Sequence, residues 1–296
     1  AGGETTGLQH ASPKVFVPRR EREKPSRMPP LAASLIPSRG GAWAGGMDWD
    51  VLLFLFFAGL SAGFIDAVAG GGGLISVPAL LWSGLTPQMA LGTNKMQSTW
   101  GTLMAVRKYA KAGLVSWREA RLTVLVTFVF ACAGSWTVTQ VSNEMLKKIV
   151  PWMLLGIALY VLLSPGFGKV PAKARLGMAA FAGIAGIVLG FYDGFFGPGT
   201  GTFWAMACIS LAGMELTRAT AFTKVANLTS NLASLAVFVA TDRVNYSIAA
   251  AMIAGQLIGG RWGASMAIRH GAPFIRVIFL SVVFAMVIKL LWEQFR

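Results

Sequence analysis

The chain has few charged residues for its length. Only 13% of its 296 residues are Asp, Glu, Lys or Arg, against about 25% in a soluble domain, while 55% are hydrophobic and the mean hydropathy is +0.61. Its apolar runs approach the ~20 residues that a helix needs to cross a bilayer. The runs are continuous rather than alternating, which argues against the lipid-facing strands of a barrel. The composition therefore predicts an all-α, polytopic membrane protein.

Cysteine and histidine are almost absent. The two cysteines, Cys132 and Cys208, lie far apart within apolar runs, where a buried structural thiol is the expected role. The two histidines are His10, near the start of the chain, and His270, in a predicted loop. This inventory provides no disulfide framework, no metal or haem site and no Ser-His-Asp triad. We therefore expect no cofactor, no metal and no enzymatic activity.

The formal net charge of +14 does not indicate nucleic-acid binding. The basic residues lack the aromatic interleaving that reads bases, and most of those after residue 46 lie in short stretches between apolar runs, as topology determinants do. The expected partner of these stretches is the anionic surface of the lipid bilayer.

Residues 1–46 differ from the rest of the chain. They are rich in Pro, Ser, Gly and Arg and have no apolar period, so they predict a disordered basic leader. The alternative is a non-native extension ahead of a start at Met47, because the apolar region begins directly after that residue. Seven of the 26 basic residues lie in this segment: Lys14, Arg19, Arg20, Arg22, Lys24, Arg27 and Arg39.

The rest of the chain contains an internal duplication. The stretch GFIDAVAGGGG, from Gly63 to Gly73, has a counterpart GFYDGFFGPGT, from Gly190 to Thr200. Their aspartates, Asp66 and Asp193, are 193 − 66 = 127 positions apart. A second match follows at an offset of 224 − 95 = 129, between Thr93-Asn94-Lys95 and Phe222-Thr223-Lys224. We therefore predict two homologous transmembrane repeats, residues 47–168 and residues 169–296.

Each repeat is expected to contain five helices. In the first repeat they fall at about 51–69, 74–83, 88–110, 120–140 and 147–163. In the second they fall at about 176–194, 200–212, 216–240, 246–268 and 274–292. Glycine pairs at the spacing that allows close helix approach occur within three of these helices. They are Gly59/Gly63, Gly186/Gly190 and Gly255/Gly259.

Helix length decides how the glycine-rich breaks are used. A straight helix from Val51 to the turn after Ser83 would be ~50 Å long, whereas the hydrocarbon core is ~30 Å thick. The arm at about 74–83 is too short to cross alone. A hairpin that enters the membrane, turns at the glycines and returns to the same face explains both facts. Each repeat is then a broken, re-entrant helix hairpin plus three transmembrane helices.

Three crossings per repeat would invert the second repeat relative to the first in the membrane. Inverted repeats with broken helices that meet near the midplane are a recurring transporter plan. The basic stretches around Arg107–Arg121 and Lys169–Arg175 would then both face the cytoplasm, as the positive-inside rule expects. A retained basic leader would instead lie outside. A parallel arrangement of the two repeats is the alternative.

Two carboxylates lie inside the apolar runs. After Met47 the chain has nine Asp and Glu residues, and only Asp66 and Asp193 are away from the ends of apolar runs. A charge at that depth costs at least ~2.5 kcal/mol on insertion scales, so a functional role is the default hypothesis. Lys95 and Lys224 lie one or two turns inside their helices. The alternative is two structural Asp–Lys pairs, or lysines that extend to the membrane surface.

These residues predict a central anion site. The helices that follow the breaks point free N–H groups at the glycine turns, which favours an anion. Burial near the ends of the preceding helices is expected to favour protonated aspartates, which could carry protons in exchange for an anion. No Gly-Lys-Ser/Thr follows either glycine turn, so nucleotide binding is not expected. The predicted pathway residues are Asp66, Gly70, Gly71, Gly72, Gly73, Asn94, Lys95, Asp193, Gly197, Gly199, Lys224, Asn227 and Asn231.

From about Met47 to its end, the chain resembles the TauE/SafE sulfite-exporter family. The resemblance is carried by GFIDAVAGGGG with Thr93-Asn94-Lys95, and by GFYDGFFGPGTG with the later Lys224 and Asn227. It is closest to the bacterial branch known as probable membrane transporter proteins. The resemblance implies a multi-pass permease of the bacterial inner membrane that handles small anions such as sulfite, sulfonates or other small organic acids. Residues 1–46 lie outside the family pattern.

Two functions are expected from the same central site. One is a secondary transporter of a small anion, coupled to protons or to the membrane potential. The other is an uncoupled anion channel or uniporter. An intramembrane enzyme would need a nucleophile–base pair or a metal cluster, and the sequence offers neither. A homo-oligomer is compatible with either function.

Overall fold

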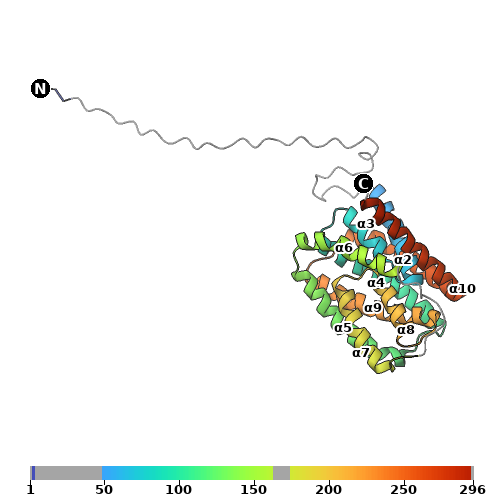
Figure 1. The fold of residues 1–296 in the computed structure, drawn as a ribbon. Coiled ribbons are helices and arrows are strands. Elements are labelled where there is room, and N and C mark those ends of the chain that lie inside the picture. Colours follow the sequence, from blue (N-terminus) through green and yellow to red (C-terminus); the bar gives the residue numbers. More distant parts are fainter. Residues whose placement is uncertain (1, 4–48, 163–173, 295–296) are drawn as a thin grey trace. The chain divides into compact units, whose positions relative to one another are not determined.

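The computed structural model describes residues 2–3, 49–162 and 174–294, which form nine helices and no strand (Figure 1). The all-α class predicted from the sequence is confirmed for these residues. The predicted leader, the link around residues 169–173 and the repeat boundary at 168/169 lie outside the described residues.

The helices follow the predicted order. In the first part they are α2 (Trp49–Ala69), α3 (Gly73–Trp82), α4 (Pro87–Lys111), α5 (Trp117–Gln140) and α6 (Asn143–Leu162). In the second part they are α7 (Met178–Phe195), α8 (Thr200–Ser210), α9 (Leu216–Ala240) and α10 (Tyr246–Gln294). Among the helices before α10, the bound that differs most from its prediction is the start of α6, which lies at Asn143 instead of about 147.

Helix α10 consists of two helical arms joined at Gly271. The backbone of this glycine has φ 64° and ψ −155°, which breaks the helix between the two arms. Two separate helices, at about 246–268 and 274–292, were predicted for this segment. The prediction of two arms is therefore confirmed.

Three helices among the described residues are long and apolar enough to cross a membrane: α2, α5 and α7. Large apolar side chains on these helices point away from the protein, among them Leu53, Leu125 and Val188. Such a surface suits a lipid environment rather than water. The sequence predicted that α2 and α7 belong to hairpins and are not full crossings. Whether they form hairpins depends on how α3 and α8 pack against them.

Helices α3 and α8 each turn back along the preceding helix. The rings of Phe54, near the start of α2, and Trp82, at the end of α3, have centroids 4.7 Å apart. The carbonyl of Leu211, just after α8, accepts hydrogen bonds from the N–H groups of Arg175 and Leu176, at 2.9 and 3.0 Å, just before α7. Both breaks therefore form hairpins, and neither α2–α3 nor α7–α8 is a straight rod.

The tips of the two hairpins touch each other. Gly70, after α2, has φ 79°, and a Cβ on it would lie 2.5 Å from the carbonyl carbon of Gly201 in α8. Thr202 donates its hydroxyl to the carbonyl of Ala69 at 3.3 Å. Glycine is required at position 70 for two reasons, because φ is positive and because there is no space for a side chain.

Glycines also bring the helices around the hairpins close together. Gly59 and Gly63 of α2 face the backbone of α10 at Met252 and Gln256, and Gly255 of α10 in turn faces α2. On the other hairpin, Gly190 of α7 lies against Thr127 of α5. The predicted close approach at all three glycine pairs is thus observed, as α2 with α10 and α7 with α5.

Helices α4 and α9 pass beside the hairpin tips and are fixed at their ends. At the start of α4, the Gln88 side chain donates to backbone carbonyls at the end of α5, including that of Val141 at 2.7 Å. At the start of α9, Glu215 accepts from the N–H groups of Thr217 and Arg218 and caps the helix. Tyr109 of α4 donates its hydroxyl to the carbonyl of Ala67 at 3.0 Å, which ties α4 to the end of α2. The duplication itself, and the orientation of one repeat relative to the other, stay predictions.

Candidate functional site

A small polar cavity lies where the hairpin tips meet α4 and α9. Its volume is about 20 Å³, which is room for roughly one water molecule. Most of the predicted pathway residues line it. The full lining is Asp66, Gly70, Gly73, Asn94, Lys95, Ser98, Asp193, Gly197, Thr200, Gly201, Asn227 and Asn231.

The first ion pair at this site is short and almost completely buried. Lys95 Nζ of α4 lies 2.6 Å from Asp193 Oδ1 at the end of α7, and the two side chains are 2% and 5% exposed. The second carboxylate oxygen of Asp193 accepts a hydrogen bond from the Ser230 hydroxyl of α9. Lys95 also donates to Asn231 Oδ1 at 3.3 Å. Every charged atom of this pair therefore has a close polar partner.

The second ion pair is longer and partly open. Lys224 Nζ of α9 lies 3.4 Å from Asp66 Oδ2, and the side chains are 0% and 17% exposed. The closer contact of Lys224 is with the backbone carbonyl of Asp66 rather than with its carboxylate. The Thr102 hydroxyl donates to the same oxygen, Oδ2, at 3.3 Å. No donor from the described part of the chain bonds Asp66 Oδ1, so this carboxylate is only half satisfied.

The two pairs connect the first half of the chain with the second. Lys95 lies 98 positions from Asp193, and Lys224 lies 158 positions from Asp66. Each lysine thus neutralises the aspartate of the other half. The functional reading and the alternative of structural Asp–Lys pairs both predicted that acids and lysines would meet, and the structure brings all four together. The other alternative, lysines that extend to the membrane surface, is wrong, because both lysines are buried. The sequence did not indicate which lysine would pair with which aspartate.

The N-terminal ends of two helices, α3 and α8, also lie at the cavity. Gly73 begins α3, Gly201 is the second residue of α8, and both line the cavity. Among the hydrogen bonds of the described residues, none satisfies the N–H of Gly73 or of Gly201. Unpaired N–H groups at helix N-termini carry partial positive charge, so this edge of the cavity is suited to a negative group.

Gly197 keeps the turn after α7 close to the first ion pair. Its φ is 93°, and a Cβ on it would lie 3.0 Å from Lys95 Nζ and 3.2 Å from Asp193 Oδ1. A side chain at this position would therefore strain the turn and crowd the pair.

Four predicted pathway residues do not line the cavity: Gly71, Gly72, Gly199 and Lys224. Gly72 and Gly199 precede α3 and α8, and Gly72 packs against Ala62 and the Cβ of Asp66. Gly71 accepts a hydrogen bond from the N–H of Leu74 in the same turn. Lys224 contacts Asp66, which does line the cavity.

Sequence reasoning missed several polar residues of the site. Ser98 lines the cavity, and Thr102 and Ser230 bond the two carboxylates. The duplication contained the signal for two of them. At the offset of 129, the predicted Asn227 corresponds to position 227 − 129 = 98, and Asn231 corresponds to 231 − 129 = 102. Applying the offset to the asparagines would have identified Ser98 and Thr102.

Asn94 belongs to a buried polar network between α3 and α4. Its side-chain oxygen accepts hydrogen bonds from Ser76 at 2.5 Å, from Gln97 at 2.8 Å and from Ser98 at 3.4 Å. In the second half, position 94 + 129 = 223 is Thr223 and position 97 + 129 = 226 is Ala226. The network around Asn94 on α4 therefore has no full counterpart at the matching positions of α9.

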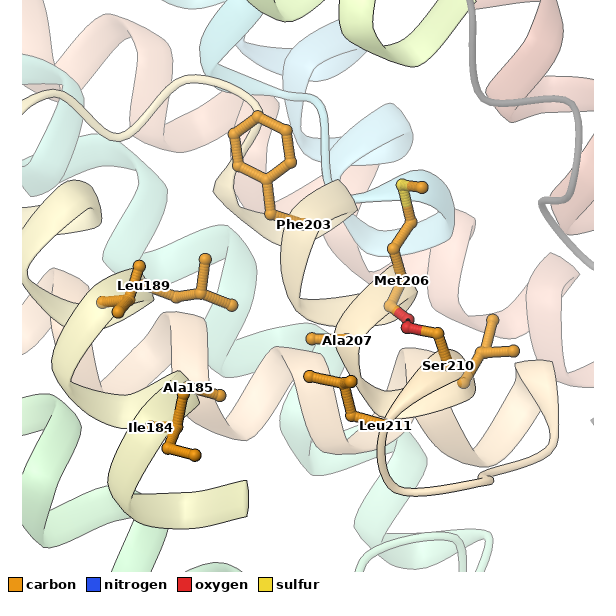
Figure 2. A pocket seen from close by; sticks show the side chains of 10 residues that line it. Ile184, Ala185, Leu189, Phe203, Met206, Ala207, Ser210 and Leu211 are labelled. Atoms are coloured by element: carbon orange, nitrogen blue, oxygen red, sulfur yellow. Dashed lines mark hydrogen bonds between the residues drawn. The ribbon is translucent and has the colours of Figure 1, made fainter. Parts of the chain in front are cut away.

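Other features of the described residues offer no comparable chemistry. No group of three or more His, Cys, Asp or Glu side chains in these ranges could hold a metal ion. Cys132 and Cys208 are free thiols. A larger hollow of about 490 Å³ lies between α7 and α8, but no charged residue lines it (Figure 2). Its apolar walls include Ile184 and Leu189 of α7 and Phe203 and Met206 of α8.

Comparison with known proteins agrees with the resemblance seen in the motifs. The family model described as "Sulfite exporter TauE/SafE" matches residues 55–290. A "Probable membrane transporter protein" of Haemophilus influenzae is 40% identical over 245 residues, which cover 83% of this chain and 96% of that protein. No solved structure matches the chain significantly.

Two further relatives have names of the same kind. "Probable membrane transporter protein YfcA" of Escherichia coli strain K12 is 39% identical over 240 residues, which cover 81% of this chain and 89% of the relative. "Probable membrane transporter protein ORF9" of Sinorhizobium sp is 39% identical over 245 residues, with 83% and 94% covered.

Proposed function

The chain belongs to the sulfite exporter TauE/SafE family of membrane transporters, and from this premise we propose that it is a secondary transporter of a small anion in the bacterial inner membrane. Sulfite, sulfonates and other small organic acids are the proposed substrate class. We propose a transport function and no enzymatic one, in keeping with the names of the relatives.

The observation that carries this proposal is the cavity with its two reciprocal ion pairs and two free helix N-termini. Lysine ammonium groups and unpaired N–H groups are the donors that bind a small oxyanion. Asn227 and Asn231 add side-chain amides to the lining. Charged groups are rare in transmembrane segments and typically mark substrate or ion pathways.

Competition for the lysines gives the site a way to couple an anion to a proton. When both carboxylates are ionised, they neutralise both lysines and the site has no net charge to attract another anion. A proton on Asp66 would leave Lys224 uncompensated, and a small anion could then take the place of the carboxylate beside it. Proton and anion would occupy the site together, instead of in exchange as the sequence suggested, because carboxylate and anion compete for the same ammonium.

Asp66 is the proposed proton carrier because its pair is the weaker one. Its carboxylate lies 3.4 Å from the ammonium and is 17% exposed, whereas Asp193 lies 2.6 Å from its lysine and is 5% exposed. Each carboxylate has two side-chain partners, but those of Asp66 are farther away, so releasing Asp66 breaks longer contacts than releasing Asp193.

We also propose that the two halves are inverted repeats. The N-terminal ends of α5 and α9 lie together, since Arg218 pairs with Glu119 at 2.5 Å. This places the end of α4 and the end of α8 on one side. The end of α3 is connected to the opposite end of α4, which is ~37 Å away along 25 residues. The open end of the α2–α3 hairpin therefore lies near the start of α4, and the open end of the α7–α8 hairpin lies near the end of α4. Two hairpins that open in opposite directions support inverted repeats.

The small size of the cavity favours a transporter over an open channel. A channel that conducts needs a continuous water-filled path, whereas about 20 Å³ is too small for a sulfite-sized anion. The hairpin tips would have to separate to admit a substrate. This is the alternating access expected when broken helices meet at a central site.

Counterflow in proteoliposomes tests the proposal. Vesicles loaded with unlabelled sulfite, sulfate, a sulfonate or a carboxylate would be diluted into labelled substrate at several pH values. We expect saturable counterflow of at least one small anion, faster at lower pH. Currents that scale linearly with anion concentration, without counterflow, would establish the channel alternative.

The Asp66→Asn variant tests proton coupling separately. The Asn side-chain amide does not titrate in the pH range of the assay, so we expect residual transport whose rate no longer responds to pH. Asp50→Asn, the same substitution at the start of α2, is the matched control and should behave like the unchanged protein. If Asp66→Asn retains the full pH response, Asp66 is not the proton carrier.

A further inference from the structure

A second charged feature lies on the exposed side of α10. Arg261 is exposed and lies 261 − 246 = 15 residues after the start of α10 and 271 − 261 = 10 residues before the break at Gly271. At ~1.5 Å per residue it is ~22 Å from one end of this arm and ~15 Å from the other. In a membrane-crossing helix, as the sequence predicts for this arm, an unpaired guanidinium at that depth is costly. Among the described residues no carboxylate forms an ion pair with Arg261.

Arg261 lies in an open groove between α4 and α10 of about 620 Å³. Helices α4 and α10 run in the same direction there, because Gly92 faces Arg243 and Gly101 faces Gly260. The described lining residues are Met104, Leu257, Ile258, Arg261, Trp262 and Ser265. Among these described residues the lining is mainly apolar, and Arg261 is the one cationic group.

A second exposed arginine follows along α4. Arg107 is one turn beyond Met104, toward the same end of the helices as Lys108 and Lys111. This basic end is the one that the positive-inside rule assigns to the cytoplasm. Basic pockets between transmembrane helices on that side are typical sites for phosphate headgroups.

From these observations we propose that the α4–α10 groove binds an anionic phospholipid. The phosphate lies between Arg261 and Arg107, where the long arginine side chains can reach up toward the headgroup level. An acyl chain lies along Leu257 and Ile258, against the Trp262 indole. The proposal concerns a surface separate from the central cavity and does not depend on the transported substrate.

A second copy of the chain fits the groove less well. It would have to present a carboxylate to Arg261 at the same depth. Within the described helices, only Asp66 and Asp193 are carboxylates away from a helix end, and both are already paired with lysines. The hollow between α7 and α8 in Figure 2 provides an internal comparison, because it is apolar but has no charged lining residue.

Quenching of Trp262 by brominated lipids tests the proposal on the full chain in bilayers. Phosphatidylglycerol or phosphatidylcholine with brominated acyl chains would be added to bilayers of unbrominated phosphatidylcholine. The contribution of Trp262 is the difference between the unchanged protein and Trp262→Phe. We expect about fivefold preference for phosphatidylglycerol, which corresponds to ~1 kcal/mol for one basic residue near the surface.

Two variants complete the design. Arg261→Gln should lose this preference and retain general quenching by both lipids. Ile184→Trp in the Trp262→Phe background places a reporter in the charge-free hollow of Figure 2 and should show no preference. Equal quenching of Trp262 by both lipids in the unchanged protein would overturn the proposal. A second result would also overturn the proposal. If neither lipid quenches Trp262 and Arg261→Gln breaks up a dimer of the protein, the groove is an interface between two copies of the chain.

Discussion

The two ion pairs around the cavity have the same chemistry but different surroundings. Lys95–Asp193 is short, nearly water-free and supported by Ser230 and Asn231. Lys224–Asp66 is longer, and its lysine is bonded more closely to a backbone carbonyl than to the carboxylate. The difference teaches that matching residues in two halves of a chain need not have matching roles. We infer that the first pair holds the hairpin of α7–α8 against α4, and that the second pair can open.

The largest effect on stability is expected from Lys95→Met. Removing the lysine leaves the Asp193 carboxylate buried without its partner, and breaking a buried pair in this way costs roughly 3–5 kcal/mol. Lys224→Met should cost less, because Asp66 is partly exposed and can be reached by water. Unfolding of the solubilised protein in a denaturing detergent measures both variants.

The double variant Lys95→Met/Asp193→Leu is the control for this comparison. Replacing both partners by apolar residues removes the uncompensated charge, so much of the lost stability should return while anion transport stays absent. Equal losses in Lys95→Met and Lys224→Met would mean that the two pairs do not differ as proposed.

The second-largest effect is expected at the contact between the two hairpin tips, which positions both ion pairs. Gly70→Ala introduces strain at φ 79°, which costs roughly 1–3 kcal/mol, and adds a Cβ that overlaps the backbone of Gly201. Gly84→Ala is the matched control, since its φ is 92° but a Cβ there meets nothing within 4 Å. Thermal unfolding should show a clearly larger loss for Gly70→Ala. Similar losses at the two positions would show that strain alone matters.

A smaller effect is expected from Ser230→Ala. It removes a hydrogen bond to the Asp193 carboxylate, and such bonds to charged groups contribute roughly 1.5–3 kcal/mol. The corresponding change beside the looser pair, Thr102→Val, removes a bond of 3.3 Å to Asp66 and should cost less. The free energy of unfolding orders the two variants. The reverse order would contradict the assignment of the tight pair as the structural one.

The smallest effect is expected at the exposed pair of Arg218 and Glu119. These side chains are 48% and 37% exposed, and exposed ion pairs contribute about 0–1 kcal/mol. Arg218→Gln should therefore hardly change stability, and any effect should fade as salt is added. A loss comparable to that of Lys95→Met would mean that this contact between α5 and α9 carries more of the fold than its exposure indicates.

Much of the fold could be predicted from local sequence properties. Apolar run length predicted the helices, and the glycine stretches after Asp66 and Asp193 predicted where α2 and α7 would end. The two aspartates and two lysines are unusual already in the sequence, because charged residues are rare so far inside apolar runs. Ser98, Thr102 and Ser230 were missed because hydroxyl residues are common in membrane helices and become significant only through the partner that they bond.

The sequence by itself determined that this protein is helical and apolar, that its helices break at two glycine turns, and that four charged side chains lie inside its helices. These properties depend on the chemistry of neighbouring residues along the chain. Only the tertiary structure decided that Lys95 faces Asp193 and Lys224 faces Asp66, that one pair is tighter, and that the cavity between them is small. Those features depend on how closely α4, α9 and the two hairpin tips approach one another. That approach is set by packing between segments up to 158 positions apart, which no local pattern records.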